Sequence, residues 1–335
     1  MVTGRGSGAP PAGGRGTQPS FSERYAPPKP PRWRRVLSVD TLQSVLTFVI
    51  AVALVAGIGY LTWVSIERSG RLADPPARPG VAGDVKPPEG TKVIELTSAD
   101  GTMLSAWATP SKAKKAKTAV ILVHDAGGHR ADLKGLATAL RADHDVISLD
   151  LRGHGASADA ATTLGPAEAE DVRAAIDAVV EDGDTRIVLV GVGLGASAAL
   201  AAASGDPRID GIVAIAPWPR VADAIAAQLK ADDVPLAWPA DWATLVALLF
   251  RTGRDVTSAD ALDAVTRTTA PIMLVTGSDD PLLTATTLRT LEDLAPDLTT
   301  WTVKGARDDA TGVVTDADGI ARIVDFIQAS FKRGD

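Results

Sequence analysis

The chain of 335 residues has no cysteine, four histidines and few aromatic residues (4%). Without cysteine it can form no disulfide, carries no thiol nucleophile, and cannot hold an iron–sulfur cluster or a zinc site of the cysteine type. With so few aromatic side chains, a core has to be built mainly from Ala, Val, Leu and Ile. An excess of basic residues is also missing, since the net charge is −7. This balance argues against a nucleic-acid partner, which needs a positively charged surface.

The charge is unevenly distributed along the chain. Residues 1–41 hold seven Lys and Arg against two acidic residues, a balance of +5, so the remainder carries −12. Residues 1–40 are rich in Gly, Pro, Ser and Arg and have almost nothing to bury. Such a segment cannot offset the entropy lost on ordering, so we predict a disordered basic tail.

Residues 41–66 contain no charged side chain. About 20 apolar residues span a bilayer as a helix, so this stretch predicts one transmembrane helix, with the lipid bilayer as a partner. A cleaved signal peptide is the alternative. The apolar run is too long for the core of a signal peptide and no A-x-A-like site follows it, which favours a retained single-pass anchor.

Basic residues flank the predicted anchor on both sides. Positive charge favours the cytoplasmic side, and the side before the anchor has one nearby cation more than the side after it. We therefore expect a cytoplasmic N-terminus and an extracytoplasmic large domain. Residues 67–91 are rich in Pro and Gly and predict a linker between the anchor and that domain. The flanking cations are Lys29, Arg32, Arg34 and Arg35 before the anchor, and Arg68, Arg71 and Arg78 after it.

From residue 92 to the end, strand and helix patterns alternate. Residues 92–110 predict a hairpin, and continuous apolar runs typical of buried strands then alternate with helical spacing. Repeated strand–helix units after a hairpin predict a mostly parallel sheet with helices on both faces, in a domain of residues 92–335. The later strands are predicted at 118–125, 145–150, 186–192, 209–217, 272–277 and 299–305, and the helices at 130–143, 166–182, 195–204, 283–294 and 318–332.

An insertion at residues 220–270 interrupts this alternation. Its composition predicts a short helical cap over one end of the sheet. Trp218, Trp238 and Trp242 lie in or beside it. They either form a small core of the insertion itself or line an apolar pocket beneath the cap, and such pockets are where small molecules bind.

Five motifs follow one another along residues 92–333. They are HDAGG at 124–128, DLRGHGAS at 150–157, GVGLG at 191–195, GSDD at 277–280 and GARD at 305–308. In this order they resemble the α/β-hydrolase superfamily, nearest to its serine aminopeptidase and monoacylglycerol-lipase-like branch. In that resemblance HDAGG is similar to an HG-type oxyanion loop and GVGLG stands in the place of the nucleophile elbow. The resemblance implies an α/β-hydrolase fold with the cap and the preceding transmembrane helix.

The resemblance implies a serine, an acid and a histidine as the catalytic triad. The serine position holds Gly193, the histidine position falls on Asp308, and only Asp280 matches. No histidine follows His154. Ser197, one helical turn beyond the elbow, is expected to pack rather than to act as a nucleophile.

Two roles remain open for the surviving acid. Asp280 is expected to form an ion pair with Arg307, in the place of the family's acid–histidine bond. A water-activating Asp280, alone or sharing a proton with Asp308, is the chemical alternative. His124 and His154 are expected to have structural roles.

The resemblance also implies an oxyanion hole formed by the backbone N–H groups of Ala126 and Leu194. A glycine at position 193 is expected to enlarge this site for a carboxylate or carbonyl ligand. The chain is thus predicted to be a pseudo-hydrolase that binds a small acyl or peptide ligand, or a protein partner. An active esterase, lipase or peptidase with non-standard residues is the alternative.

Two further patterns, a possible dinucleotide fingerprint and a group of acidic residues, are weaker indications of a ligand. The spacing of Gly191, Gly193 and Ala196 fits a dinucleotide fingerprint, but it does not fall in the first strand–helix unit. The acidic residues after 278 could chelate calcium, but a solvated acidic face is favoured in so negative a domain. We therefore expect no cofactor and no metal.

Overall fold

The computed structural model describes residue 20 and residues 39–75, 85–113, 117–295, 297–306 and 310–333. The chain divides into two compact units, Met1–Gly57 and Ile58–Asp335. Almost all of the predicted basic tail, and residues 76–84 of the predicted linker, lie outside the described residues.

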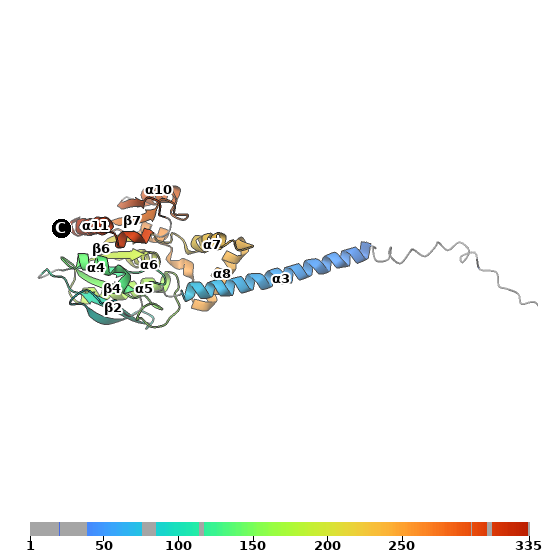
Figure 1. The fold of residues 1–335 in the computed structure, drawn as a ribbon, viewed down its shortest axis with the longest axis horizontal. Helices are drawn as coiled ribbons and strands as arrows, with labels where there is room; N and C mark the ends of the chain where they lie inside the picture. Colours follow the sequence, from blue (N-terminus) through green and yellow to red (C-terminus); the bar gives the residue numbers. More distant parts are fainter. Residues whose placement is uncertain are drawn as a thin grey trace, which may run out of the picture. The chain divides into compact units, whose positions relative to one another are not determined.

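Helix α3 (Val39–Ala73) contains the whole uncharged stretch. Its most apolar window has a mean hydropathy of 2.3 and no buried residue, so by length and composition α3 can cross a membrane. It is the only such helix in the part of the chain that the structure describes. The helix appears in blue in Figure 1.

The predicted linker is wrong for residues 67–73, because they continue α3. Glu67 and Arg71 pair one turn apart at 2.5 Å, and the first proline after the apolar stretch is Pro75. A helix continues through polar residues until a residue that cannot be helical ends it. The loss of hydrophobicity after residue 66 therefore marked the end of the apolar run rather than the end of the helix.

The second unit is built on an eight-stranded sheet with strand order β1-β2-β4-β3-β5-β6-β7-β8. β1, β2 and β4 pair antiparallel, and the pairs from β4 across to β8 are parallel. The mostly parallel sheet predicted from the sequence is confirmed. The strands are β1 (Lys92–Thr97), β2 (Met103–Thr109), β3 (Thr118–Val123), β4 (Asp145–Leu149), β5 (Arg186–Val192), β6 (Ile209–Ile215), β7 (Ile272–Gly277) and β8 (Leu298–Val303).

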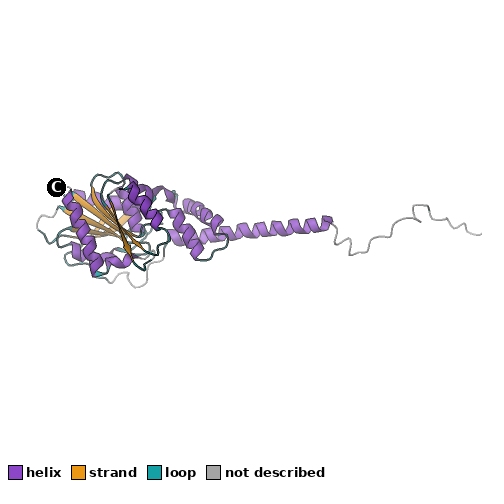
Figure 2. Cartoon of the chain, turned by 90° about the horizontal axis from the view of Figure 1, so that it is seen from above, coloured by secondary structure: helices purple, strands orange, loops and turns teal. Residues whose placement is uncertain are grey.

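Helices cover both faces of this sheet (Figure 2). Alternate residues of β3 point to opposite faces: Ile121 packs in one apolar cluster and Val120 in the other. This is why the strand reads as a continuous apolar run. One face is covered by α5 (Pro166–Glu181), α6 (Leu194–Ala203), α9 (Ala261–Arg267) and α10 (Ala285–Leu294), and the other by α4 (Lys134–Leu140) and α11 (Ala317–Arg333).

Helix α6 is the central helix of the first face, and all ten of its residues are buried. Six of the ten are alanine, whose small side chain lets the helix lie close to the sheet. The N-terminus of α6 is therefore fixed directly at the end of β5.

The insertion between β6 and β7 is helical. It contains α7 (Val221–Ala231), α8 (Ala237–Thr252), the short helix η2 (Val256–Ala259) and α9. A third apolar cluster joins α7 and α8 to Val64 and Ala73 of α3, with Trp218 packed against it. The insertion thus has a core of its own, completed by the last turns of α3.

Candidate functional site

Gly193 forms the sharp turn between β5 and α6. Its backbone has φ 53° and ψ −117°, a conformation that residues with a side chain rarely adopt. The elbow expected from the resemblance is therefore present in its backbone geometry. What it lacks is the side chain that would attack a substrate.

The side chain of Asp125 fills the space at this turn. A Cβ atom placed on Gly193 would lie 1.8 Å from Oδ1 of Asp125 and 2.3 Å from its Cγ. The same Oδ1 accepts a hydrogen bond from the backbone N–H of Leu194 at 3.0 Å. The Asp125 carboxylate thus fills the space of a nucleophile side chain at position 193. It also accepts a hydrogen bond from Leu194 N–H, one of the two expected oxyanion donors.

This arrangement corrects the expectation of an enlarged oxyanion site. A glycine at position 193 leaves space beside the turn, but the side chain of Asp125 fills that space, so it is not open to a ligand. Ala126, the other expected donor, is partly buried and packs against the apolar cluster of the first face. The sequence signal that would have predicted the arrangement is the HD pair at 124–125, where the resemblance has HG.

The two histidines nearest this loop are bound to backbone. In His124, Nε2 accepts from Leu151 N at 3.1 Å and Nδ1 lies 2.7 Å from the carbonyl oxygen of Asp125. In His154, Nε2 accepts from Gly127 N at 3.0 Å and Nδ1 lies 2.7 Å from the carbonyl oxygen of Arg152. An Nε2 atom that accepts a backbone N–H has no proton, so each ring donates through Nδ1. These bonds support the structural role expected for both histidines.

Ser197 and Asp280 are also held by the fold. Ser197 is buried, and its Oγ accepts from the backbone N–H of Trp218 at 2.9 Å. Oδ1 of Asp280 accepts from Leu282 N at 2.8 Å and Leu283 N at 2.9 Å. The family's acid position therefore stabilises a turn after β7. The predicted partners Arg307 and Asp308 lie outside the described residues.

The 150–157 loop is built around a buried ion pair. Arg152 bonds Asp171 of α5 at 2.6 Å and Asp100 of the first hairpin at 2.6 Å. The guanidinium of Arg152 holds the pKa of Asp100 well below its usual range. Burial alone would lower the pKa of Arg152, but the two carboxylates raise it above its usual value. This network fastens the loop, the hairpin and α5 together.

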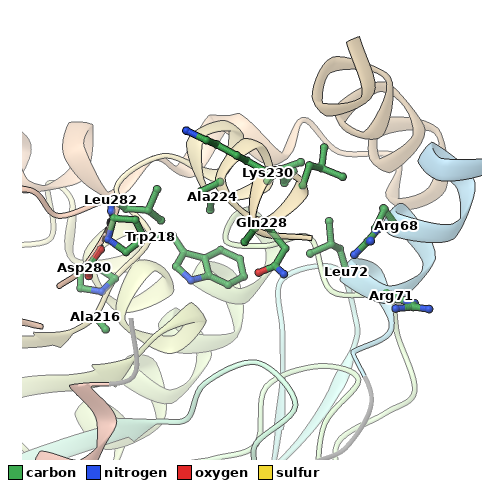
Figure 3. A pocket seen from close by; sticks show the side chains of 16 residues that line it. Arg68, Arg71, Leu72, Ala216, Trp218, Ala224, Gln228, Lys230, Asp280 and Leu282 are labelled. Carbon is green, nitrogen blue, oxygen red and sulfur yellow. Dashed lines mark hydrogen bonds between the residues drawn. The ribbon is translucent and has the colours of Figure 1, made fainter. Parts of the chain in front are cut away.

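A cavity of about 740 Å³ opens beneath α7, at the carboxyl ends of β6 and β7. Asp280 and Ala216 lie at one end of it, Trp218 lies in the middle, and Arg68 and Arg71 of α3 lie at the other end (Figure 3). Ligands of parallel sheets commonly bind at the carboxyl ends of the strands, and the cavity lies at those ends.

Only one of the three tryptophans expected at a pocket lies there. Trp218 is partly buried and lines the cavity. Trp238 and Trp242 are 85% and 70% exposed and point away from the core of the insertion. Both alternatives, a shared core of the insertion and a shared pocket, are therefore wrong for Trp238 and Trp242, because the buried face of α8 is formed by Ala240, Thr244 and Leu248 instead.

Metal-binding geometry is absent from the described part of the chain. Among those residues no group of three or more His, Asp or Glu side chains is placed to hold an ion.

Together, the three-layer fold, the glycine elbow and the cavity under a helical insertion define an α/β protein of hydrolase architecture. The family model described as "Alpha/beta hydrolase family" matches residues 120–331. The chain therefore belongs to the α/β-hydrolase family, as the motifs predicted.

The same fold recurs in solved hydrolase structures, esterases among them. An esterase of Pyrococcus furiosus is 22% identical with a TM-score of 0.59, over 75% of this chain and 98% of that one. A thermophilic esterase of Thermogutta terrifontis is 17% identical with a TM-score of 0.52, over 71% and 99%. E-2-(acetamidomethylene)succinate hydrolase is 21% identical with a TM-score of 0.52, over 71% and 100%. A search of curated proteins found no match. At these identities the structural likeness shows the fold alone.

Proposed function

We propose that this protein is a membrane-anchored pseudo-hydrolase that binds a small acyl or peptide ligand without serine chemistry. The observation that carries the proposal is the Asp125 carboxylate at the elbow, against Gly193 and bonded to Leu194 N. A serine hydrolase needs a nucleophile at this turn and free donors for the oxyanion. Here the first is missing and one of the donors is already bound.

The cavity supports ligand binding. It combines an apolar wall, formed by residues such as Leu72, Ile225 and Leu229, with Asp280 at one end and two arginines at the other. A mostly apolar site with a few polar groups at fixed places is typical of small-molecule binding. Family membership favours a ligand with an acyl or amide group.

The anchor and its orientation belong to the same proposal. Helix α3 is long and apolar enough to span a bilayer, and the basic residues before it favour a cytoplasmic N-terminus. The second unit is then extracytoplasmic.

A second candidate function is hydrolysis through Asp125 itself. A carboxylate can act as a nucleophile or activate water, and this one lies where the family places its nucleophile. Esterases among the solved structures with this fold favour an ester substrate for such an activity.

One experiment separates the two functions. The full chain, carrying 5-fluorotryptophan, is placed in lipid nanodiscs and mixed with p-nitrophenyl butyrate. The pseudo-hydrolase predicts a shift of the Trp218 fluorine signal, assigned with Trp218→Phe, and no nitrophenolate release above empty nanodiscs. Trp107 of β2, assigned with Trp107→Phe, is the control that should not shift.

If the unmodified chain releases nitrophenolate and the Asp125→Ala variant does not, the protein is a hydrolase that acts through Asp125, and the pseudo-hydrolase proposal is wrong. If the Trp218 signal does not shift and no nitrophenolate is released, acyl-ligand binding in this cavity is wrong.

A further inference from the structure

Helix α8 has an exposed apolar face, which we define as Trp238, Trp242, Leu249 and Phe250. Trp238 is 85% exposed and Phe250 84%. At 100° per residue, positions 238, 242 and 249 fall within about 40° of one another on the helix, and 250 lies about 80° further round. The half-buried Leu245 and Val246 belong to the same stripe.

No charged residue interrupts this face. The charged residues of α8 are Asp241, which by helical spacing lies on one flank of the face, and Arg251, which lies on the opposite side of the helix. Arg251 pairs with Asp74, just beyond the end of α3, at 2.6 Å. Single exposed apolar residues are common on protein surfaces, but a contiguous apolar face with two tryptophans marks an interaction surface.

The opposite face of α8 packs in an apolar cluster that also contains residues of α3. Ala240 and Leu248 are buried in the same cluster as Val64 of α3. All of these residues lie in the second unit, where Figure 1 shows α8 beside the end of α3 that adjoins the domain. Val64 belongs to the uncharged stretch 41–66. Two residues after the end of that stretch, Arg68 forms an ion pair with Asp232, which directly follows α7.

These positions bring α8 to the level at which the apolar stretch ends. If α3 spans a bilayer, the chain leaves the lipid near residues 66–68, where the first charged side chains follow. Tryptophan prefers the boundary between lipid headgroups and acyl chains. An amphipathic helix with such a face lies in the membrane surface with its apolar side buried.

We propose that the exposed face of α8 docks onto the surface of the same bilayer that α3 spans. The contact is apolar rather than electrostatic, because the nearby cations Arg68, Arg71 and Arg251 are paired with acids. It therefore forms on neutral phosphatidylcholine. The ligand cavity beneath α7 then lies close to the lipid. The inference uses the α3 anchor of the proposed function but none of its claims about catalysis.

The test uses the absence of cysteine, which makes any introduced cysteine the only thiol in the chain. The full chain is reconstituted in phosphatidylcholine vesicles with a nitroxide label at one cysteine, and collisions with oxygen and with a water-soluble nickel complex are measured. Trp242→Cys and Phe250→Cys report the α8 face. Phe48→Cys, on α3, reports the anchor, and Val93→Cys, on β1 and 62% exposed, is the aqueous control.

The proposal expects both α8 labels to lose nickel collisions and gain oxygen collisions relative to the label at 93, like the label at 48. If the label at 48 is in lipid while both α8 labels behave like the one at 93, the docking surface is wrong and the anchor stands. If the labels at 48, 242 and 250 are all aqueous, the anchor and the docking surface both fail.

A second copy of the chain could also cover this face. The α8 labels would then lose collisions with both reagents and show dipolar broadening that disappears on dilution with unlabelled protein. That result would overturn docking on lipid in favour of a dimer.

Discussion

Gly193 and Asp125 form a coupled pair, and a double-mutant cycle measures the coupling. Gly193→Ala forces a side chain into a backbone conformation that costs about 1–3 kcal/mol. Its Cβ, 1.8 Å from Oδ1, must also expel the carboxylate of Asp125. The hydrogen bond from Leu194 N is then lost, which costs roughly 1.5–3 kcal/mol for a charged acceptor.

Asp125→Ala alone should cost about 1.5–3 kcal/mol, because it removes the same hydrogen bond. The double variant then loses that bond only once, so it should be about as stable as Gly193→Ala. The expected coupling is therefore about 1.5–3 kcal/mol. Urea unfolding of the full chain in detergent micelles, followed by circular dichroism, measures all three differences.

The matched control is Gly205→Ala. Gly205 also has a positive φ of 75°, but a Cβ there meets nothing within 4 Å. Its cost of about 1–2 kcal/mol should add to that of Asp125→Ala without coupling. The reasoning is refuted if Gly193→Ala and Asp125→Ala are additive to within about 0.5 kcal/mol, since the two groups would then not share the site.

Two further predictions concern stability. Burial, with Asp145 and Asp182 nearby, raises the pKa of Asp184 to about 6 from an ordinary 3.8, so the folded state loses stability as the pH rises from about 4 to 6. Asp184→Asn should therefore stabilise the protein by about 1–3 kcal/mol at pH 7.5 and change little at pH 3.5, in urea titrations at both values; equal effects at both would contradict the shifted pKa. Arg152→Ala should destabilise by about 3–5 kcal/mol because it leaves a buried carboxylate unpaired, whereas Arg254→Ala, at a partly exposed pair, should cost under about 1 kcal/mol. Similar urea midpoints for the two arginine variants would argue against a buried network.

Much of the fold was predictable because its signals are local. A strand buried on both faces, such as β3, reads as an unbroken apolar run, and α11 shows helical spacing without help from its neighbours. The motifs and their order then gave the family resemblance. The end of α3 was missed because residues 67–73 change in polarity without changing their ability to form a helix.

The candidate site was predictable only in part. The missing serine could be read directly at position 193, and the buried role of Ser197 follows from its place in α6. The carboxylate of Asp125 was missed because it enters the elbow from the loop after β3, 68 residues earlier in the chain, and its only signal is the HD pair at 124–125. The direction of Trp238 and Trp242 depends on which face of α8 packs, and both faces of that helix contain apolar residues.

Labelling with an activated-serine probe tests the central claim most directly. The full chain in nanodiscs is incubated with a fluorophosphonate, and its intact mass is measured beside an active serine esterase treated in the same way. With Gly193 at the elbow and Ser197 buried against Trp218 N, the account predicts no added mass while the esterase is labelled. A stoichiometric adduct on any serine of this chain would contradict the account and identify a nucleophile.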